Sequence, residues 1–237
     1  MLTKIRLPPW TNDDMINQLK HFHDLWANRP IANNIGGMRS TPMFQFWFTL
    51  QYLKPKIIIE SGVFRGLGTY FIQLACPEAQ VFCIEPRQDR IRYRHKNAMY
   101  FTQDFSKIPW DKYISQSNFL DVLFFIDDHQ NDFSRIPLCQ ELGIKHILLE
   151  DNYAQGTGDC YTLKKAFENE EDSQYLHNVL EIYSELPPVY KGEQWRGEPW
   201  NHPTSNPLLT KVEYPYQQVF YDEQKEYTWF AYAKLKG

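Results

Sequence analysis

The sequence has no long apolar run. Across its 237 residues, no stretch approaches the roughly 18 apolar residues that a membrane-spanning helix requires. The longest apolar stretches, such as Val122–Ile126, have only the length of a strand. The first residues, MLTKIRLPPWTNDD, also lack the apolar segment of a signal peptide. We therefore expect a cytoplasmic protein that has no membrane partner.

Cysteine is scarce as well, because the chain has only four: Cys76, Cys83, Cys139 and Cys160. They form no C-x-x-C pair and are too few for a disulfide framework, so reduced thiols are expected. A G-x-S-x-G motif is also missing, and no cysteine stands in the sequence context of a nearby histidine base. These absences leave little support for a hydrolase with a serine or cysteine nucleophile.

Positive charge is not in excess, because 25 Lys and Arg residues face 29 Asp and Glu residues and the net charge is −4. This balance argues against a protein whose main task is to bind a polyanion, although a local basic groove is compatible with it. Aromatic side chains, in contrast, are abundant at 16%. They indicate either a large aromatic core or a stacking surface for a planar or sugar-like ligand.

The arrangement of apolar residues predicts the fold class. Helical spacing predicts an N-terminal helical cap over residues 1–54. Short apolar runs that end in acidic residues predict strands at 56–60, 81–85, 99–104, 121–128 and 146–151. Helix-like stretches lie between most of them, at 69–76, 88–96 and 132–142. This alternation predicts an α/β fold with a Rossmann-like, doubly wound and mostly parallel sheet.

The C-terminal part of the expected domain (55–237) begins with a helix over Asp159–Glu170. An irregular insertion rich in Pro, Trp and Tyr follows at 183–215 and is a candidate lid or acceptor-binding segment. Two strand-like runs, Gln217–Tyr221 and Tyr227–Lys234, predict an antiparallel hairpin at the edge of the sheet. We expect the cap and this domain to form a single compact unit.

A glycine-rich turn directly follows the first predicted strand. It contains Gly62, Gly66 and Gly68, and such a turn between a strand and a helix offers free N–H groups and lets a ligand approach the backbone. The third glycine of the dinucleotide motif is missing. The strand ends in Glu60, whose carboxylate would repel a pyrophosphate and suits a ligand that carries positive charge.

Acidic residues also follow the next two predicted strands. Glu85 lies 25 residues after Glu60, where a carboxylate can accept hydrogen bonds from ribose hydroxyls. Asp104 could hydrogen-bond a base on which Phe105 stacks, although a plain loop acid is an equally good interpretation of Asp104.

The strongest signal lies after the last two parallel strands. Asp127, Asp128 and His129 follow one of them. Glu150, Asp151 and Asn152 follow the other, and carboxyl ends of parallel strands meet at one edge. Carboxylates crowded there raise each other's pKa, and a hard cation such as Mg²⁺, Mn²⁺ or Ca²⁺ relieves the repulsion. His129 is a candidate base, a partner of a metal ligand or an exposed loop histidine.

These motifs together resemble those of class I S-adenosylmethionine-dependent methyltransferases over roughly residues 40–170. Phe125-Ile126-Asp127 with Leu148 to Asn152 resembles catechol O-methyltransferase, in which an Asp and an Asp-Asn pair hold Mg²⁺. The turn from Glu60 to Gly66 is closer to the macrocin O-methyltransferase and cephalosporin hydroxylase-like families. The resemblance implies that Asp127 and Asp151 are metal ligands, with Glu150 and Asn152 as alternatives for a third.

The resemblance also implies the remaining roles. Glu85 would hold the ribose of the cofactor, and Asp104 with Phe105 would hold the adenine. Where catechol O-methyltransferase has a lysine base this chain has Gln130, so Asp128 or His129 would have to replace it. The rest of the implied cofactor pocket consists of Glu60, near the methionine ammonium, with Gly62, Gly66, Gly68 and Asp127.

The implied reaction is cation-dependent methylation of a hydroxyl on a small molecule, either a sugar or a phenolic or glycosylated metabolite. A nucleic-acid methyltransferase is a less favoured alternative, because the [Asn/Asp]-Pro-Pro-aromatic motif is missing after the fourth strand and Pro187-Pro188 lies in the wrong place. A non-methylating, hydroxylase-like cofactor-binding protein is a second alternative. If the chain oligomerises, a homodimer is the expected assembly.

Overall fold

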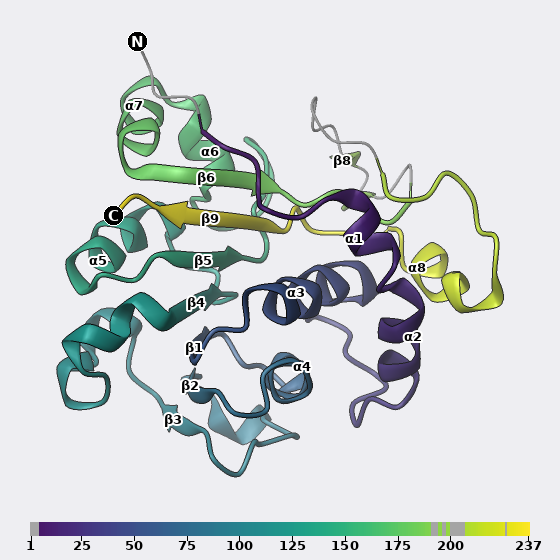
Figure 1. Ribbon diagram of the computed structural model, residues 1–237, viewed down its shortest axis with the longest axis horizontal. Coiled ribbons are helices and arrows are strands. Elements are labelled where there is room, and N and C mark those ends of the chain that lie inside the picture. Colours follow the sequence, from purple (N-terminus) through teal and green to yellow (C-terminus); the bar gives the residue numbers. More distant parts are fainter. Residues whose placement is uncertain (1–4, 191–193, 196–197, 200–206, 226) are drawn as a thin grey trace.

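The computed structural model describes residues 5–190, 194–195, 198–199, 207–225 and 227–237. A seven-stranded sheet with the strand order β3-β2-β1-β4-β5-β9-β6 forms its centre (Figure 1). The strands are β1 (Ile57–Ser61), β2 (Gln80–Ile84), β3 (Met99–Phe101), β4 (Val122–Ile126), β5 (His146–Leu149), β6 (Leu180–Glu185) and β9 (Ala231–Leu235).

The sheet is parallel from β3 to β5, and β9 then runs antiparallel to both β5 and β6. The five strands predicted between residues 55 and 151 are therefore confirmed, as is the mostly parallel sheet with an antiparallel edge. The strand order reverses at β1, which lies between β2 and β4. In open α/β sheets, ligands bind beyond the carboxyl ends of the strands at such a reversal.

Helices cover both faces of the sheet (Figure 1). Because successive residues of a strand point to opposite faces, Ile58 of β1 packs on one side while Ile57 and Ile59 pack on the other. The first side carries α1 (Asn12–Ile16), α2 (Leu19–Ala27), α3 (Ser40–Leu53), α4 (Leu67–Ala75) and α8 (Gln218–Asp222). The second carries α5 (Asp132–Leu142), α6 (Leu163–Glu168) and α7 (Glu170–Val179).

Aromatic side chains fill much of this core. The largest fully buried side chains are all Trp, Tyr or Phe, among them Trp47 and Phe124. Phe46 of α3 stacks on Phe125 of β4, with ring centroids 4.2 Å apart, so the N-terminal helices share the core of the sheet. Core packing thus accounts for much of the aromatic content. The domain boundary at residue 54 stays a prediction.

Two local predictions were wrong. Residues 88–96 form only the short 3-10 turn η1 (Gln88–Arg90), because the N–H groups of Arg92 and Tyr93 both donate to the carbonyl oxygen of Arg65 and hold the segment as a loop. Residues 217–221 were expected to be a hairpin strand but form α8, where Phe220 is buried in the core. The antiparallel partner of β9 on that side is β6 instead.

The remaining elements are short. They are the 3-10 turns η2 (Phe105–Lys107), η3 (Trp110–Lys112), η4 (Gln116–Asp121) and η5 (Pro215–Gln217), and the two-residue strands β7 (Gln194–Trp195) and β8 (Glu198–Pro199). The candidate lid at 183–215 lies partly outside the described residues, at 191–193, 196–197 and 200–206. In the part of the chain that is described, no helix combines the length and the apolar character needed to cross a membrane.

Candidate active site

A cavity of about 450 Å³ lies at the carboxyl ends of β1, β2 and β4. It is lined by the turn after β1, by residues at the ends of β2 and β4, where the sequence predicted a ligand, and by a loop of the N-terminal cap. Its walls include Gly36, Gly37, Ser61, Gly62, Phe64, Glu85, Arg87, Arg90, Asp104, Asp127, Asp128 and His129. Small-ligand sites in proteins have volumes of roughly 300 to 1,000 Å³, so the space suits a cofactor-sized molecule.

The glycines of the turn after β1 allow loops of the protein to approach one another. Gly62 has a φ of +96°, and a Cβ there would lie 1.8 Å from the backbone oxygen of Asp127. Gly66 has a φ of +90°, and its Cβ would lie 2.2 Å from the carbonyl oxygen of Tyr93. Both positions need glycine because L side chains rarely adopt these angles and because the space is taken by backbone. The glycines of this turn are therefore required for close packing against the backbone of Asp127 and Tyr93, in addition to any contact with a ligand in the cavity.

Glu60 is buried beneath the start of α4. Its carboxylate accepts a hydrogen bond from Thr69 Oγ1 at 2.5 Å and one from Cys83 Sγ at 3.4 Å. Burial raises the pKa of Glu60 to about 7. A Cβ on Gly68 would lie 2.4 Å from Glu60 Oε1, so the predicted glycine here makes room for the carboxylate.

A smaller space of about 10 Å³ lies beside Glu60 and shares Gly37, Gly62 and Asp127 with the main cavity. Asn34 also lines this space; its Nδ2 donates to the Met38 carbonyl, whereas its buried Oδ1 has no hydrogen-bond partner. Sequence reasoning missed Asn34, because it lies in a loop of the cap and belongs to no motif. The space therefore combines a carboxyl group and an unused amide oxygen.

Glu85 lies at the end of β2, as predicted, and is 8% exposed at the cavity wall. Its two carboxylate oxygens accept hydrogen bonds from the backbone N–H groups of Phe64 and Arg87, each at 2.8 Å. Each oxygen retains a further lone pair for a ligand hydroxyl. Glu85 thus connects the turn after β1 to the loop after β2 while it faces the cavity.

Asp104 reaches the cavity, but its carboxylate is already paired. Arg135 of α5 donates to both oxygens of Asp104, at 2.9 and 2.6 Å, and to Asp128 at 3.2 Å. Hydrogen bonds from Arg135 lower the pKa of Asp104. Arg135 was missed because nothing in the sequence distinguishes it from other polar residues of the helix. It connects the loops after β3 and β4.

Phe105 is a correction. It was expected to stack on a base, but its ring is buried in the core and stacks on Phe124 of β4, with centroids 4.2 Å apart. Phe105 is not among the residues that line the cavity. An aromatic residue directly after a strand end can face either the core or the crevice, and apolar burial decided the outcome here.

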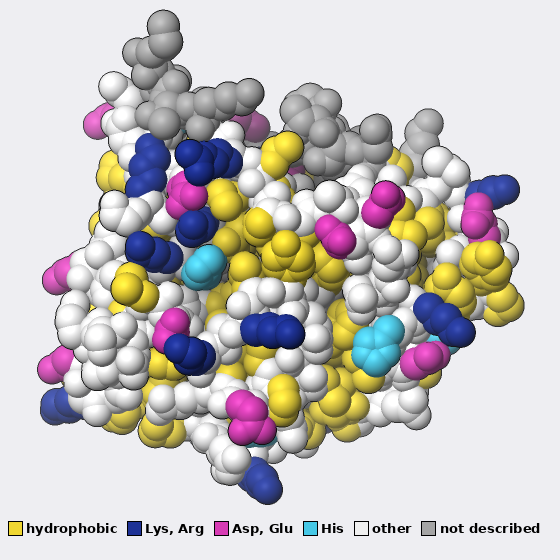
Figure 2. Space-filling view, in the orientation of Figure 1, with side chains coloured by type: hydrophobic (Ala, Val, Ile, Leu, Met, Phe, Trp, Pro, Cys, Tyr) yellow, Lys and Arg dark blue, Asp and Glu magenta, His cyan; other side chains and the backbone are white. Residues whose placement is uncertain are grey.

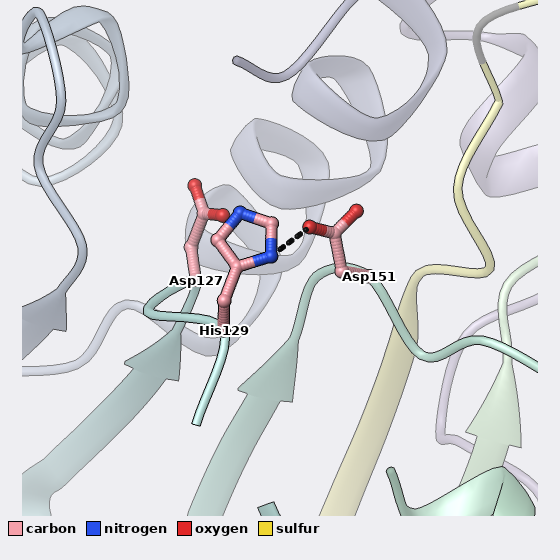
Figure 3. A group of neighbouring side chains, drawn as sticks. All are labelled: Asp127, His129 and Asp151. Atoms are coloured by element: carbon pink, nitrogen blue, oxygen red, sulfur yellow. Dashed lines mark ion pairs between the residues drawn. The ribbon is translucent and has the colours of Figure 1, made fainter. Parts of the chain in front are cut away.

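Asp127, His129 and Asp151 come together above the ends of β4 and β5 (Figure 3). Each offers an atom that could hold a metal ion, and these atoms all lie within 4.8 Å of one another. His129 Nδ1 lies 3.3 Å from Asp151 Oδ2 and 3.1 Å from Asp159 Oδ1. Figure 3 shows the imidazole between the two carboxylates of the group. His129 and Asp151 both have a φ of +54°, which is uncommon for residues other than glycine.

The acids here are crowded, with Glu150 and Asp151 buried and Asp127 partly buried. Burial raises the pKa of Asp127 well above its ordinary value, and the charges of Asp151 and Glu60 raise it further. Burial and the charges of Asp151 and Asp127 raise the pKa of Glu150 in the same way. Glu150 also accepts a hydrogen bond from Thr228 Oγ1 at 2.5 Å. A divalent cation is the kind of ligand that relieves such repulsion.

The structure turns Asn152 away from this group, which corrects its assignment as a possible metal ligand. Its Nδ2 donates to Tyr183 Oη at 2.8 Å, and its Oδ1 accepts from the backbone N–H of Lys164 at 3.0 Å. Both polar atoms are therefore used to hold β6 and the start of α6. From the sequence, His129 was a candidate base, a partner of a metal ligand or an exposed loop histidine. The structure makes it a candidate metal ligand itself.

Asp128 points toward other partners. Its carboxylate accepts hydrogen bonds from Ser61 Oγ at 2.6 Å, from the Gln130 N–H at 3.1 Å and from Arg135 at 3.2 Å. These contacts fix the loop after β4 against the loops after β1 and β3. A carboxylate with these donors is poorly placed to accept a proton from a substrate.

Comparison with known proteins gives matches in structure only. No family model matches the sequence, and no curated protein matches it. A tRNA (m1A58) methyltransferase, TrmI from Aquifex aeolicus, has a TM-score of 0.50 at 10% identity, covering 92% of this chain and 76% of its own. Cofactor-bound Rv0187 from MTB has a TM-score of 0.48 at 10% identity, covering 93% and 89%. A protein from Klebsiella pneumoniae assigned as an O-methyltransferase has a TM-score of 0.45 at 10% identity, covering 98% and 92%.

At 10% sequence identity, these similarities are evidence for the fold alone. The chain has the fold of the class I S-adenosylmethionine-dependent methyltransferases.

Proposed function

We propose that this protein is a divalent-cation-dependent O-methyltransferase that uses S-adenosylmethionine to methylate a hydroxyl group of a small molecule, such as a sugar or a phenolic or glycosylated metabolite. One observation carries the proposal. The Asp127, His129 and Asp151 group stands at one end of a cofactor-sized cavity, whose other walls include the turn after β1 and Glu85.

The residues around the cavity fit S-adenosylmethionine. Glu85 offers acceptors for ribose hydroxyls at the end of β2. Glu60 and the unpartnered Oδ1 of Asn34 offer two acceptors for an ammonium group in the adjoining space. An amide oxygen that is buried without a partner is costly, and a bound ammonium group would satisfy it.

The donor set of the neighbouring group fits a hard or borderline divalent cation. Asp127 and Asp151 offer carboxylate oxygens, and His129 offers a ring nitrogen. Mg²⁺ and Ca²⁺ favour oxygen ligands, and a histidine in the set extends the choice to Mn²⁺. Glu150 precedes Asp151 in the chain, and the charge of Asp127 raises its pKa, so it is close enough to orient a ligand.

When bound, the cofactor supplies a methyl group on a positively charged sulfur, and the cation lowers the pKa of an acceptor hydroxyl. The chain contributes orientation and charge, which account for much of the rate in such transfers. Arg135 and Ser61 hold the loop of Asp128 in place. His129 is the exposed titratable group at the junction of cavity and acidic group, so it can also accept a proton if the cation uses only carboxylates.

Isothermal titration of S-adenosylmethionine tests the proposal first. The wild type, with Mg²⁺ and with EDTA, should bind the cofactor with a micromolar Kd. Asp151→Asn should retain this binding but lose the response of its melting temperature to Mn²⁺. Asp159→Asn is the matched control, because Asp159 also contacts His129 but lies 70% exposed and outside the group. Absence of cofactor binding under every condition would overturn the proposal.

A second step identifies the acceptor. Sugars, phenols and glycosylated metabolites would be screened for formation of S-adenosylhomocysteine, with and without EDTA. Turnover that survives EDTA unchanged would remove the cation from the proposal and leave the methyltransferase activity in place.

A further inference from the structure

The loop after β2 carries a strong local excess of positive charge. Its residues 87–96 include five of the 25 Lys and Arg residues of the chain but only one acid, Asp89. Arg65 lies beside them, because its carbonyl oxygen accepts the N–H groups of Arg92 and Tyr93. We call this set the basic surface; it consists of Arg65, Arg87, Arg90, Arg92, Arg94 and Lys96.

The cations of the basic surface are not neutralised by the protein. The five loop cations are exposed, and among the described residues none of the six forms an ion pair with an acidic side chain. On the face drawn in Figure 2, by contrast, basic and acidic side chains are interspersed. An unpaired group of this size in a chain with a net charge of −4 needs an anionic partner to explain it.

The basic surface is held in a fixed position beside the cavity. Gly66 packs against the carbonyl oxygen of Tyr93, and the Phe64 and Arg87 N–H groups share the carboxylate of Glu85. Arg87 and Arg90 line the cavity itself, whereas Arg92 and Lys96 do not. The positive charge therefore extends from the mouth of the cavity outward over the loop.

We infer that the basic surface binds single-stranded RNA through its phosphate groups. Five of its six cations are arginines, whose planar forks suit phosphate oxygens. An aromatic ring accompanies one of them, because the Arg94 guanidinium lies 4.5 Å from the centre of the Tyr100 ring. Grooves that bind single strands combine cations with aromatic stacking in this way.

Two features distinguish this partner from other anions. Five of the cations are distributed over the ten residues 87–96 and Arg65 lies beside them, so they can contact several phosphates of a strand rather than one small phosphate. A membrane surface would be favoured by many apolar side chains that insert into it, and the exposed large hydrophobic side chains nearest in sequence to the basic residues are only Met99 and, near Arg65, Ile35. The inference goes beyond the proposed function, because it concerns an interaction surface and does not specify which hydroxyl is methylated.

The test is fluorescence anisotropy with a labelled single-stranded 20-mer RNA, in EDTA and without cofactor. Each phosphate contact in a single strand contributes a slope of about −0.7 to the logarithmic salt dependence. With about three to five contacts, raising the salt from about 50 to about 200 mM should weaken binding about 20- to 130-fold.

Arg92→Glu with Lys96→Glu should raise the Kd at least tenfold at low salt, while titration with S-adenosylmethionine gives the wild-type Kd. Lys20→Glu with Lys225→Glu is the matched control, since it reverses two exposed charges on other parts of the chain and should change the Kd for RNA less than twofold.

Three results would overturn the inference. They are an absence of RNA binding by the wild type at low salt, an equal loss of binding in both double variants, and binding to phosphatidylserine vesicles in place of RNA. Circular dichroism and melting temperature confirm that the variants are folded. Because no cofactor or metal is present, a failure here leaves the proposed function standing, and a failure of cofactor binding leaves this result standing.

Discussion

Two sets of acidic residues in the candidate site, Glu85 with Asp104 and Asp127 with Glu150 and Asp151, have opposite kinds of partners. In the cofactor half, formed by the loops after β1, β2 and β3, the carboxylates of Glu85 and Asp104 are paired with backbone N–H groups or with Arg135. In the cation half, formed by the loops after β4 and β5, Asp127, Glu150 and Asp151 lie close together, and burial together with the charge of Asp151 raises the pKa values of Asp127 and Glu150.

The comparison shows two roles for acidic residues: some fix the conformation of the loops, and others form an unneutralised group that a bound cation would stabilise. A carboxylate with several N–H donors fixes the conformation of a loop and adds stability to the empty protein. Carboxylates that share a buried space with one another destabilise the empty protein, because each disfavours ionisation of its neighbours. The cofactor half should therefore be rigid without ligand, whereas the cation half should gain stability when a cation binds.

The largest effect is expected from a substitution that disrupts the close packing of Gly62 against the backbone of Asp127. Gly62→Ala would place a methyl group 1.8 Å from the Asp127 carbonyl oxygen at a φ of +96°. Strain and overpacking together should cost about 4 kcal/mol or more of the free energy of unfolding, measured with urea. Gly156→Ala is the control, since its φ is +79° but nothing lies within 4 Å. Its cost should be only about 1 kcal/mol. Equal costs for both variants would show that the close approach at Gly62 is unimportant.

The second prediction acts on the cation half alone. Asp151→Asn keeps a residue that tolerates the φ of +54° but removes one of the crowded charges. Activity should fall about 100-fold, close to 2.7 kcal/mol of transition-state free energy, once an acceptor is known. The metal-free variant should nevertheless melt at a higher temperature than metal-free wild type. A lower melting temperature would contradict the idea that repulsion dominates this half.

The third prediction uses the pH dependence of the cofactor half. Burial raises the pKa of Glu60 to about 7, so its carboxyl group is neutral below that pH and charged above it. Affinity for S-adenosylmethionine should therefore rise about tenfold between pH 6 and pH 8, which corresponds to about 1.4 kcal/mol. Calorimetric titration of Glu60→Gln over the same range should give a flat profile. A wild-type profile that is also flat would remove Glu60 from ammonium binding.

The smallest effect is expected from a substitution of Arg135, which connects the loops after β3 and β4. Arg135→Lys keeps the charge but loses the two-pronged contact with Asp104. We expect the KM for S-adenosylmethionine to rise about threefold while kcat changes little, because the rim of the cofactor half loosens. A large fall in kcat with an unchanged KM would instead place the main effect of Arg135 on Asp128 and the cation half.

Much of the cofactor half could be predicted from the sequence, because it depends on local signals. A strand that ends in Glu60, a glycine turn and a second acid at Glu85 follow one another along the chain, and the register of parallel strands brings them to one edge. Phe105 could not be predicted in the same way, because its ring can face the core or the crevice. Packing against Phe124 decided its position.

The cation half was predicted only in outline for a related reason. The sequence places Asp127 and Asp151 at neighbouring strand ends, but side-chain direction there depends on loop conformation. The left-handed backbone at His129 and Asp151 turns these residues toward each other, while Asn152 is drawn away by Tyr183 and Lys164. Asn34 lies beside Glu60 and Thr228 hydrogen-bonds Glu150, but both are far from these acids in the sequence, so no local sequence pattern predicts them.

The position of β9 has a consequence for how the protein is made. Among the described strands of the sheet β6 pairs with β9 alone, and its other edge has a single bridge to Arg6, so from residue 185 to residue 231 a growing chain carries β6 without β9. The pairing of His146 with Lys234 likewise joins residues that are far apart in the order of synthesis. Contacts of such long range form slowly and leave a strand edge open to other chains in the meantime. β6 therefore emerges from the ribosome before the strand that pairs with it, and this half of the sheet is completed only once β9 has been translated.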